Sequence, residues 1–154
     1  MTETRRVSTI VDLVALVDLT GVRTFEFSGR LLDAPADAEI EERQDIQVHL
    51  RASPGDLQVR VRLTIQTDEA ELVADCAAVF ELKESDPNEQ IEIDDDVKRE
   101  FVERVGIMAV YPFLRESIFA TAVRLQVAAP VLGLLKAGQF SMTPNPQTST
   151  DFAE

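Results

Sequence analysis

Few side chains in the sequence could do chemistry, and the densest group of them is acidic. Asp94, Asp95 and Asp96 follow Glu92 closely. Carboxylates are ligands that Ca²⁺ prefers, but calcium loops space their ligands at alternate positions and include a glycine at the sharp turn. This cluster has neither feature. We therefore predict that the aspartates cap the helix that follows and complement its dipole, with no metal bound.

The single histidine and the single cysteine are the other candidates. His49 lies on a predicted strand between Gln47 and Arg51, with no serine or cysteine nucleophile beside it in sequence, so a surface position is the simpler interpretation. Cys76 falls on the apolar face of another strand and is interpreted as a small buried hydrophobic residue. Neither GxxxxGKS/T nor GxGxxG occurs. We expect no catalytic residue, no cofactor and no enzymatic activity.

Composition limits the class of partner. The chain has 154 residues, of which 45% are hydrophobic and 28% charged, and its net charge is -13. This suits one soluble domain. Such acidity repels nucleic acids and anionic membranes and suits basic partners. Asp12 and Asp18 interrupt the apolar run near the N-terminus, so we expect neither a signal peptide nor membrane insertion, and a cytoplasmic location.

The N-terminal region predicts a helix over residues 7–19. Val7, Ile10, Val11, Val14 and Val17 recur at helical spacing, and Gly21 follows at a suitable place for the helix to end. Its apolar surface is wide enough to require cover, either from the rest of the domain or from a second subunit.

Four strands are predicted next, over residues 24–31, 46–51, 58–67 and 71–82. The third is the clearest, because apolar and polar residues alternate strictly along it. In the first, Phe25, Phe27, Gly29 and Leu31 are predicted to share a face. Arg60 and Arg62 form a basic stripe on the third strand, for which we expect cross-strand ion pairs with Glu26 and Glu71.

Two consecutive helices are predicted after a polar connector at residues 83–96. The first helix would present Val97, Phe101, Val105 and Met108 on one face. A break is expected near Tyr111, with Pro112 at the start of the second helix, because proline is tolerated at the first helical position. Strands followed by helices indicate an α+β fold with an antiparallel sheet covered on one face.

With these elements in place, the chain resembles the SecB family of export chaperones over residues 22–135. The most specific match is Tyr111-Pro112-Phe113-Leu114-Arg115-Glu116, followed by an apolar segment that contains Pro130; Phe25-Glu26 and Ala78-Val79-Phe80 support it. The additional N-terminal helix looks more like the SecB-like chaperones of toxin–antitoxin modules.

The resemblance implies a single SecB-like domain over residues 1–140, with a four-stranded antiparallel sheet, helices packed on one face and an extra N-terminal helix. Residues 141–154 are expected to form a mobile tail. It also implies an ATP-independent holdase, assembled as a dimer of dimers, which binds unfolded polypeptides in apolar grooves. The residues that it implies for client binding or subunit contact are Phe25, Phe27, Tyr111, Phe113, Phe119, Val127, Pro130, Val131 and Leu134.

Arg115 and Glu116 are expected to be a structural pair, with at least one of them tied by hydrogen bonds at the helix start or in a subunit contact. The resemblance further implies that Glu26 matches one acidic residue of a SecA docking surface. Partners would then be unfolded clients, together with SecA or an antitoxin.

Two alternatives differ in class. One is a dedicated chaperone or adaptor for a single partner such as an antitoxin. The other is a small-ligand pocket or enzyme on a half-open α+β fold, which requires a titratable group with a perturbed pKa in a cavity.

Overall fold

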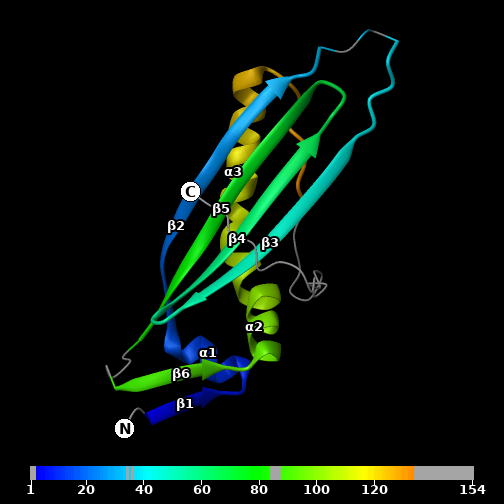
Figure 1. Cartoon of the computed structure of the whole chain (residues 1–154). Coiled ribbons are helices and arrows are strands. Elements are labelled where there is room, and N and C mark those ends of the chain that lie inside the picture. Colours follow the sequence, from blue (N-terminus) through cyan, green and yellow to red (C-terminus); the bar gives the residue numbers. More distant parts are fainter. Residues whose placement is uncertain (1–2, 34, 36, 84–87, 134–154) are drawn as a thin grey trace.

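A four-stranded antiparallel sheet with one long helix across one face forms the body of the molecule (Figure 1). The computed structural model describes residues 3–33, 35, 37–83 and 88–133. Leu134 and the predicted tail at residues 141–154 lie outside them. The sheet order is β2-β5-β4-β3, with β2 at Val17–Leu31, β3 at Arg43–Ser53, β4 at Asp56–Gln66 and β5 at Ala70–Leu82. The predicted α+β class and all four strands are confirmed.

The position of β4 was predicted correctly from the alternation of apolar and polar residues along it. Its apolar side chains are buried and its polar ones half-buried, in perfect alternation, because successive side chains of a strand point to opposite faces. A two-residue turn at Pro54 and Gly55 connects β3 to β4, and Gly55 has a φ of 92°, which favours glycine.

The N-terminal helix is shorter than predicted. α1 spans Ile10–Leu16, and the Thr9 hydroxyl caps it by accepting a hydrogen bond from the Asp12 amide at 3.1 Å. The prediction that the helix continues to residue 19 was wrong, because Val17 already pairs with Leu82 of β5. Sheet pairing, which also suits a β-branched valine, outweighs the helical spacing of the sequence.

A bulge in β2 separates the two phenylalanines that were predicted to share a face. The register with β5 shifts between Thr24 and Glu26, so Phe25 falls outside the pairing. Phe27 stands opposite Ala74, on the face that α3 covers, whereas Phe25 lies on the other face with Glu26 and Arg60. One extra residue reverses the alternation, so the sequence pattern was misleading here.

A second, two-stranded sheet was missed. β1 (Glu3–Val7) pairs in parallel with β6 (Glu89–Ile93), which lies inside the predicted polar connector. The two strands are mostly polar and exposed; Val7 and Ile93 reach the core. Strands this short and polar leave no clear periodicity in a sequence. Together with α1 they form one end of the molecule (Figure 1).

The two predicted helices are one continuous helical run. α2 (Asp95–Phe101) passes through a π-helical turn, η1 (Val102–Gly106), into α3 (Ile107–Leu125). Pro112 therefore lies inside α3, and the predicted break was wrong. Proline removes one backbone hydrogen bond from a helix, while the buried side chains of Val110, Tyr111 and Leu114 on either side hold the helix on the sheet.

The π turn also shifts the buried face of the run. Val97 and Phe101 are buried as predicted, but Val102 is buried too, whereas Val105 and Met108 are only half-buried. An extra residue in one turn rotates everything after it. α3 then packs on β2, β5 and β4 through side chains spaced three and four apart.

No helix in the described part of the chain has the length and apolar character needed to cross a membrane.

Candidate functional site

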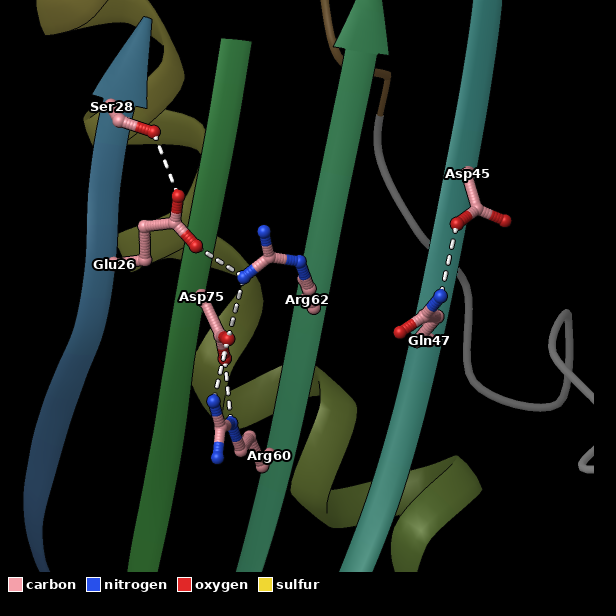
Figure 2. A network of polar contacts seen from close by, with 7 residues as sticks. All are labelled: Glu26, Ser28, Asp45, Gln47, Arg60, Arg62 and Asp75. Carbon is pink, nitrogen blue, oxygen red and sulfur yellow. Dashed lines mark hydrogen bonds and ion pairs between the residues drawn. The ribbon is translucent and has the colours of Figure 1, made fainter. Parts of the chain in front are cut away.

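The face of the sheet opposite α3 carries a network of paired charges (Figure 2). Two nitrogens of the Arg60 guanidinium group, Nε and Nη2, donate hydrogen bonds to the Asp75 carboxylate, each at 2.8 Å. Arg62 donates to Asp75 at 3.1 Å and to Glu26. Asp75 is only 1% exposed, so two arginines stabilise a buried carboxylate.

The predicted ion pairs were half right. Glu26 does pair with Arg62, but Glu71 pairs with Arg30 at 3.3 Å and not with the basic stripe. Asp75 was missed because it stands among small apolar residues in the sequence. Its place opposite Arg62 in the antiparallel register is the signal that would have found it.

Electrostatics hold this network in its charged form. The hydrogen bond from Arg62 lowers the pKa of Glu26 below 4.5, and the hydrogen bond to Asp75 raises the pKa of Arg60. The Arg60 guanidinium also lies 3.9 Å from the centroid of the Phe25 ring, a favourable cation–π contact. Permanently charged, mutually neutralising groups stabilise a surface and are poorly suited to transfer protons at neutral pH.

The candidates for chemistry lie apart from one another. Cys76 is buried, and burial raises the pKa of its thiol, which disfavours the reactive thiolate. His49 lies on β3 opposite Arg60. Among residues 3–33, 35, 37–83 and 88–133, no three histidine, cysteine or acidic side chains are grouped so that they could hold a metal ion.

The prediction that the aspartates cap the following helix is wrong for the Asp94 side chain. Asp94 is the N-cap residue of α2, but its side chain makes no capping hydrogen bond. Its carboxylate instead accepts a hydrogen bond from Arg6 Nε at 2.7 Å. The carboxylate therefore joins β1 to the start of α2, while Asp95 and Asp96 in the first turn complement the helix dipole.

An open cavity of about 400 Å³ lies at one end of the sheet. One wall is the segment of residues 127–133 that follows α3, here called the strap. The other walls are the start of β3 and the turn between β4 and β5. The lining residues are Glu42, Arg43, Gln44, Ile65, Gln66, Thr67, Asp68, Glu69, Ala128, Ala129, Pro130, Val131 and Leu132.

The strap is tied to the body at both ends. Gln126 adopts the left-handed conformation with φ 59°, which turns the chain out of α3. At the other end the Tyr111 hydroxyl donates a hydrogen bond to the Gly133 carbonyl at 2.6 Å. Between them, Val127, Ala129 and Leu132 pack partly against the core, and Val131 is 95% exposed. The strap thus offers a wall with apolar side chains to the cavity.

The residues predicted to bind clients or subunits are divided among different surfaces. Pro130 and Val131 line the cavity, and Val127 packs against the core. Phe113 and Phe119 are exposed on α3, and Tyr111 is buried beneath the strap. Phe27 lies near Arg124, at the β2 side of α3, and Phe25 lies on the opposite face of the sheet. Leu134 is outside the described residues.

Arg115 and Glu116 are not at a helix start. Both are exposed on α3, whose first residue is Ile107. The Arg115 guanidinium lies 6.0 Å from the centroid of the Tyr111 ring, and in the described part of the chain neither side chain has an ion pair or a hydrogen bond. The predicted structural role at the helix start was wrong, because the helix extends past Pro112 toward the N-terminus.

Comparisons with known proteins agree with this architecture. No protein-family model matches the chain. The SecB-like chaperone SmegB of Mycolicibacterium smegmatis is 32% identical over 142 residues, which cover 92% of this chain and 91% of that protein. Among solved structures, the Mycobacterium tuberculosis SecB-like chaperone Rv1957, in complex with a ChAD peptide from the Rv1956 HigA1 antitoxin, superposes with a TM-score of 0.66.

The structural match covers 82% of this chain and 92% of Rv1957 at 18% sequence identity, and it shows a shared fold. The sequence match to SmegB extends over nearly all of both proteins. Together with the sheet order, the long covering helix and the strap, these matches establish the family: the chain belongs to the SecB-like chaperones.

Proposed function

We propose that the protein is an ATP-independent holdase that binds non-native polypeptides at the strap and its cavity. The observation that carries the proposal is the half-open cavity of about 400 Å³, walled by Ile65, Ala129, Pro130 and Leu132 and open to solvent. The strap gives this otherwise mostly polar cavity one apolar wall at the surface, which suits apolar side chains that a folded protein would hide. Holding such segments requires no catalytic group.

Charge supports the same proposal. Glu42, Asp68 and Glu69 are exposed at the cavity, and the chain as a whole carries a net charge of -13. These three acidic residues outnumber Arg43, the one basic residue that lines the cavity, so the lining attracts basic segments, and a large net charge keeps a complex with an unfolded client in solution. The lone, buried Cys76 suits a reducing compartment, and we place the protein in the cytoplasm.

A dedicated partner is the second candidate. Rv1957, which shares the fold, was solved with an antitoxin peptide bound. In the proposed role, the same cavity would bind a peptide segment of such a partner. Copurification of one stoichiometric partner, together with failure to bind unrelated unfolded chains, would favour this narrower role. Docking of a SecA-type motor through Glu26 stays a prediction; Arg62 and Ser28 already occupy that carboxylate.

Filling the cavity tests the proposed site. Ala128 is exposed and lines the cavity, so Ala128→Trp would occupy the space without disturbing the core. We expect at least a tenfold loss of affinity for a fluorescently labelled, permanently unfolded polypeptide, measured by anisotropy. Ala38→Trp, at an exposed position outside the cavity, is the matched control. Equal affinities for the two variants would place client binding elsewhere.

We also propose that a second copy of the chain covers the exposed side of α3. Phe113, Phe119 and Val123 are 47%, 60% and 56% exposed there, and three large apolar residues on one helix form a surface typical of subunit contacts.

Introducing one charged residue on the exposed side of α3 tests whether this surface forms a subunit contact. Phe119→Asp would bury a carboxylate in the contact, so we expect the mass by light scattering to fall by half or to the 17.1 kDa of one chain. Ala38→Asp, at an exposed position outside α3, should leave the mass unchanged. A wild-type chain of 17.1 kDa in solution would contradict the proposal.

A further inference from the structure

The strap is stretched between its two anchors. From Tyr111 to Leu125 the axial length of α3 is about 21 Å at 1.5 Å per residue. The strap returns along this helix from Gln126 to the level of Tyr111, and its seven residues can span at most about 25 Å. The segment is thus close to fully extended. It keeps this extended path only while its far end is anchored.

That far anchor is one hydroxyl group. The Tyr111 ring is buried against the core, with 8% of the residue exposed, and its hydroxyl donates to the Gly133 carbonyl at 2.6 Å. Tyr111 itself does not line the cavity, whereas residues 128–132 of the strap do. The phenol therefore acts on the cavity through the strap.

We propose that Tyr111 is a positioning residue, whose hydroxyl holds the strap in place as a preformed wall of the client cavity. This inference rests on the proposed function. A wall that is fixed before binding need not be ordered during binding, so a client loses less affinity to conformational entropy. Without the hydroxyl, the strap is held only at Gln126 and by the partial packing of Val127, Ala129 and Leu132 on the core, and the client must order the end at Gly133 itself.

Tyr111→Phe tests the inference, because it keeps the buried ring and removes only the donor. One hydrogen bond corresponds to about a two- to tenfold change in an equilibrium constant. We expect client affinity to fall by that factor, through faster dissociation, and hydrogen exchange to accelerate in residues 127–133. Thr121→Val is the matched control: it removes another α3 hydroxyl, which donates within the helix to the Ser117 carbonyl at 2.9 Å.

The outcomes separate the inference from the proposed function. Unchanged exchange in the strap of Tyr111→Phe, or a loosened strap with wild-type client affinity, would overturn the positioning role. A wild-type protein that binds no unfolded polypeptide would instead refute the proposed function; the exchange comparison would still decide whether the hydroxyl holds the strap.

A measurement on the wild-type protein guards against a variant that fails to fold. The chain has one tyrosine and no tryptophan, so absorbance of the ionised phenol reports on Tyr111 alone. Burial raises the pKa of this phenol above its ordinary value. With a client peptide that lacks tyrosine and tryptophan, we expect the pKa of the phenol to stay raised, because the strap stays closed over the ring. A midpoint that falls to the value of free tyrosine on binding would overturn the inference.

Discussion

Asp75→Ala is expected to destabilise the protein by about 2–4 kcal/mol, because it leaves two arginines without the carboxylate that they share. Arg60 donates two hydrogen bonds to Asp75 at 2.8 Å and Arg62 donates one at 3.1 Å. The carboxylate is 1% exposed, whereas the arginine side chains are 22% and 34% exposed. Water can therefore reach the guanidinium groups, which keeps the expected cost below that of a fully buried pair.

Chemical denaturation of the purified variants measures this effect. Asp75→Asn keeps the shape of the side chain and its oxygen acceptor, so we expect a smaller loss of stability than for alanine. Asp45→Ala is the control, since Asp45 lies on the same face of the sheet but is exposed and accepts only one long hydrogen bond, at 3.4 Å from Gln47 (Figure 2). If Asp75→Ala and Asp45→Ala cost the same, the network contributes nothing beyond ordinary surface polarity.

Gly106→Ala is expected to cost about 1–3 kcal/mol through overpacking. A Cβ at this position would lie 2.4 Å from Cγ2 of Val59 and 2.8 Å from both its Cβ and Cγ1. Val59 is fully buried on β4, so it cannot swing aside into solvent. The π turn that contains Gly106 brings the helix backbone against the sheet at this point, and only glycine leaves room for that approach.

A double-mutant cycle separates the steric conflict from the change in helix propensity. Val59→Ala alone should destabilise by leaving a cavity. Combined with Gly106→Ala it should cost less than the sum of the two single changes, because the new methyl group occupies the vacated space. Gly21→Ala is the control, since nothing lies within 4 Å of its Cβ position. Additive costs in the cycle would show that Val59 does not restrict Gly106.

Much of the sheet was predictable because one of its faces is buried. Alternation along β4 follows directly from that burial. The errors occur where one extra residue interrupts a period: the bulge beside Phe25 reverses a strand, and η1 rotates a helix. Neither leaves a mark in composition or spacing. Pro112 led to a wrong prediction for a related reason. Proline prefers the start of a helix, but the burial of the α3 residues on both sides of Pro112 outweighs this local preference.

The site was harder to predict than the fold. Pro130 and Val131, which the resemblance implied for client binding or subunit contact, line the cavity, and their role in binding stays a prediction. The acidic residues at its opening come from the start of β3 and the turn after β4, which are far apart from the strap in sequence. The hydrogen bond from Tyr111 to Gly133 depends on the strap reversing along α3, and no residue spacing encodes that path. Asp75 required the register of β4 and β5 to be known.

Suppression of client aggregation is the defining activity of a holdase and can be measured without a known client. A chemically denatured protein is diluted into buffer without nucleotide, and its aggregation is followed by light scattering with and without this protein at equimolar amounts. We expect wild-type protein to suppress scattering in proportion to its concentration and Ala128→Trp to suppress it much less. Undiminished scattering at stoichiometric wild-type protein, for several unrelated clients, would contradict a general holdase.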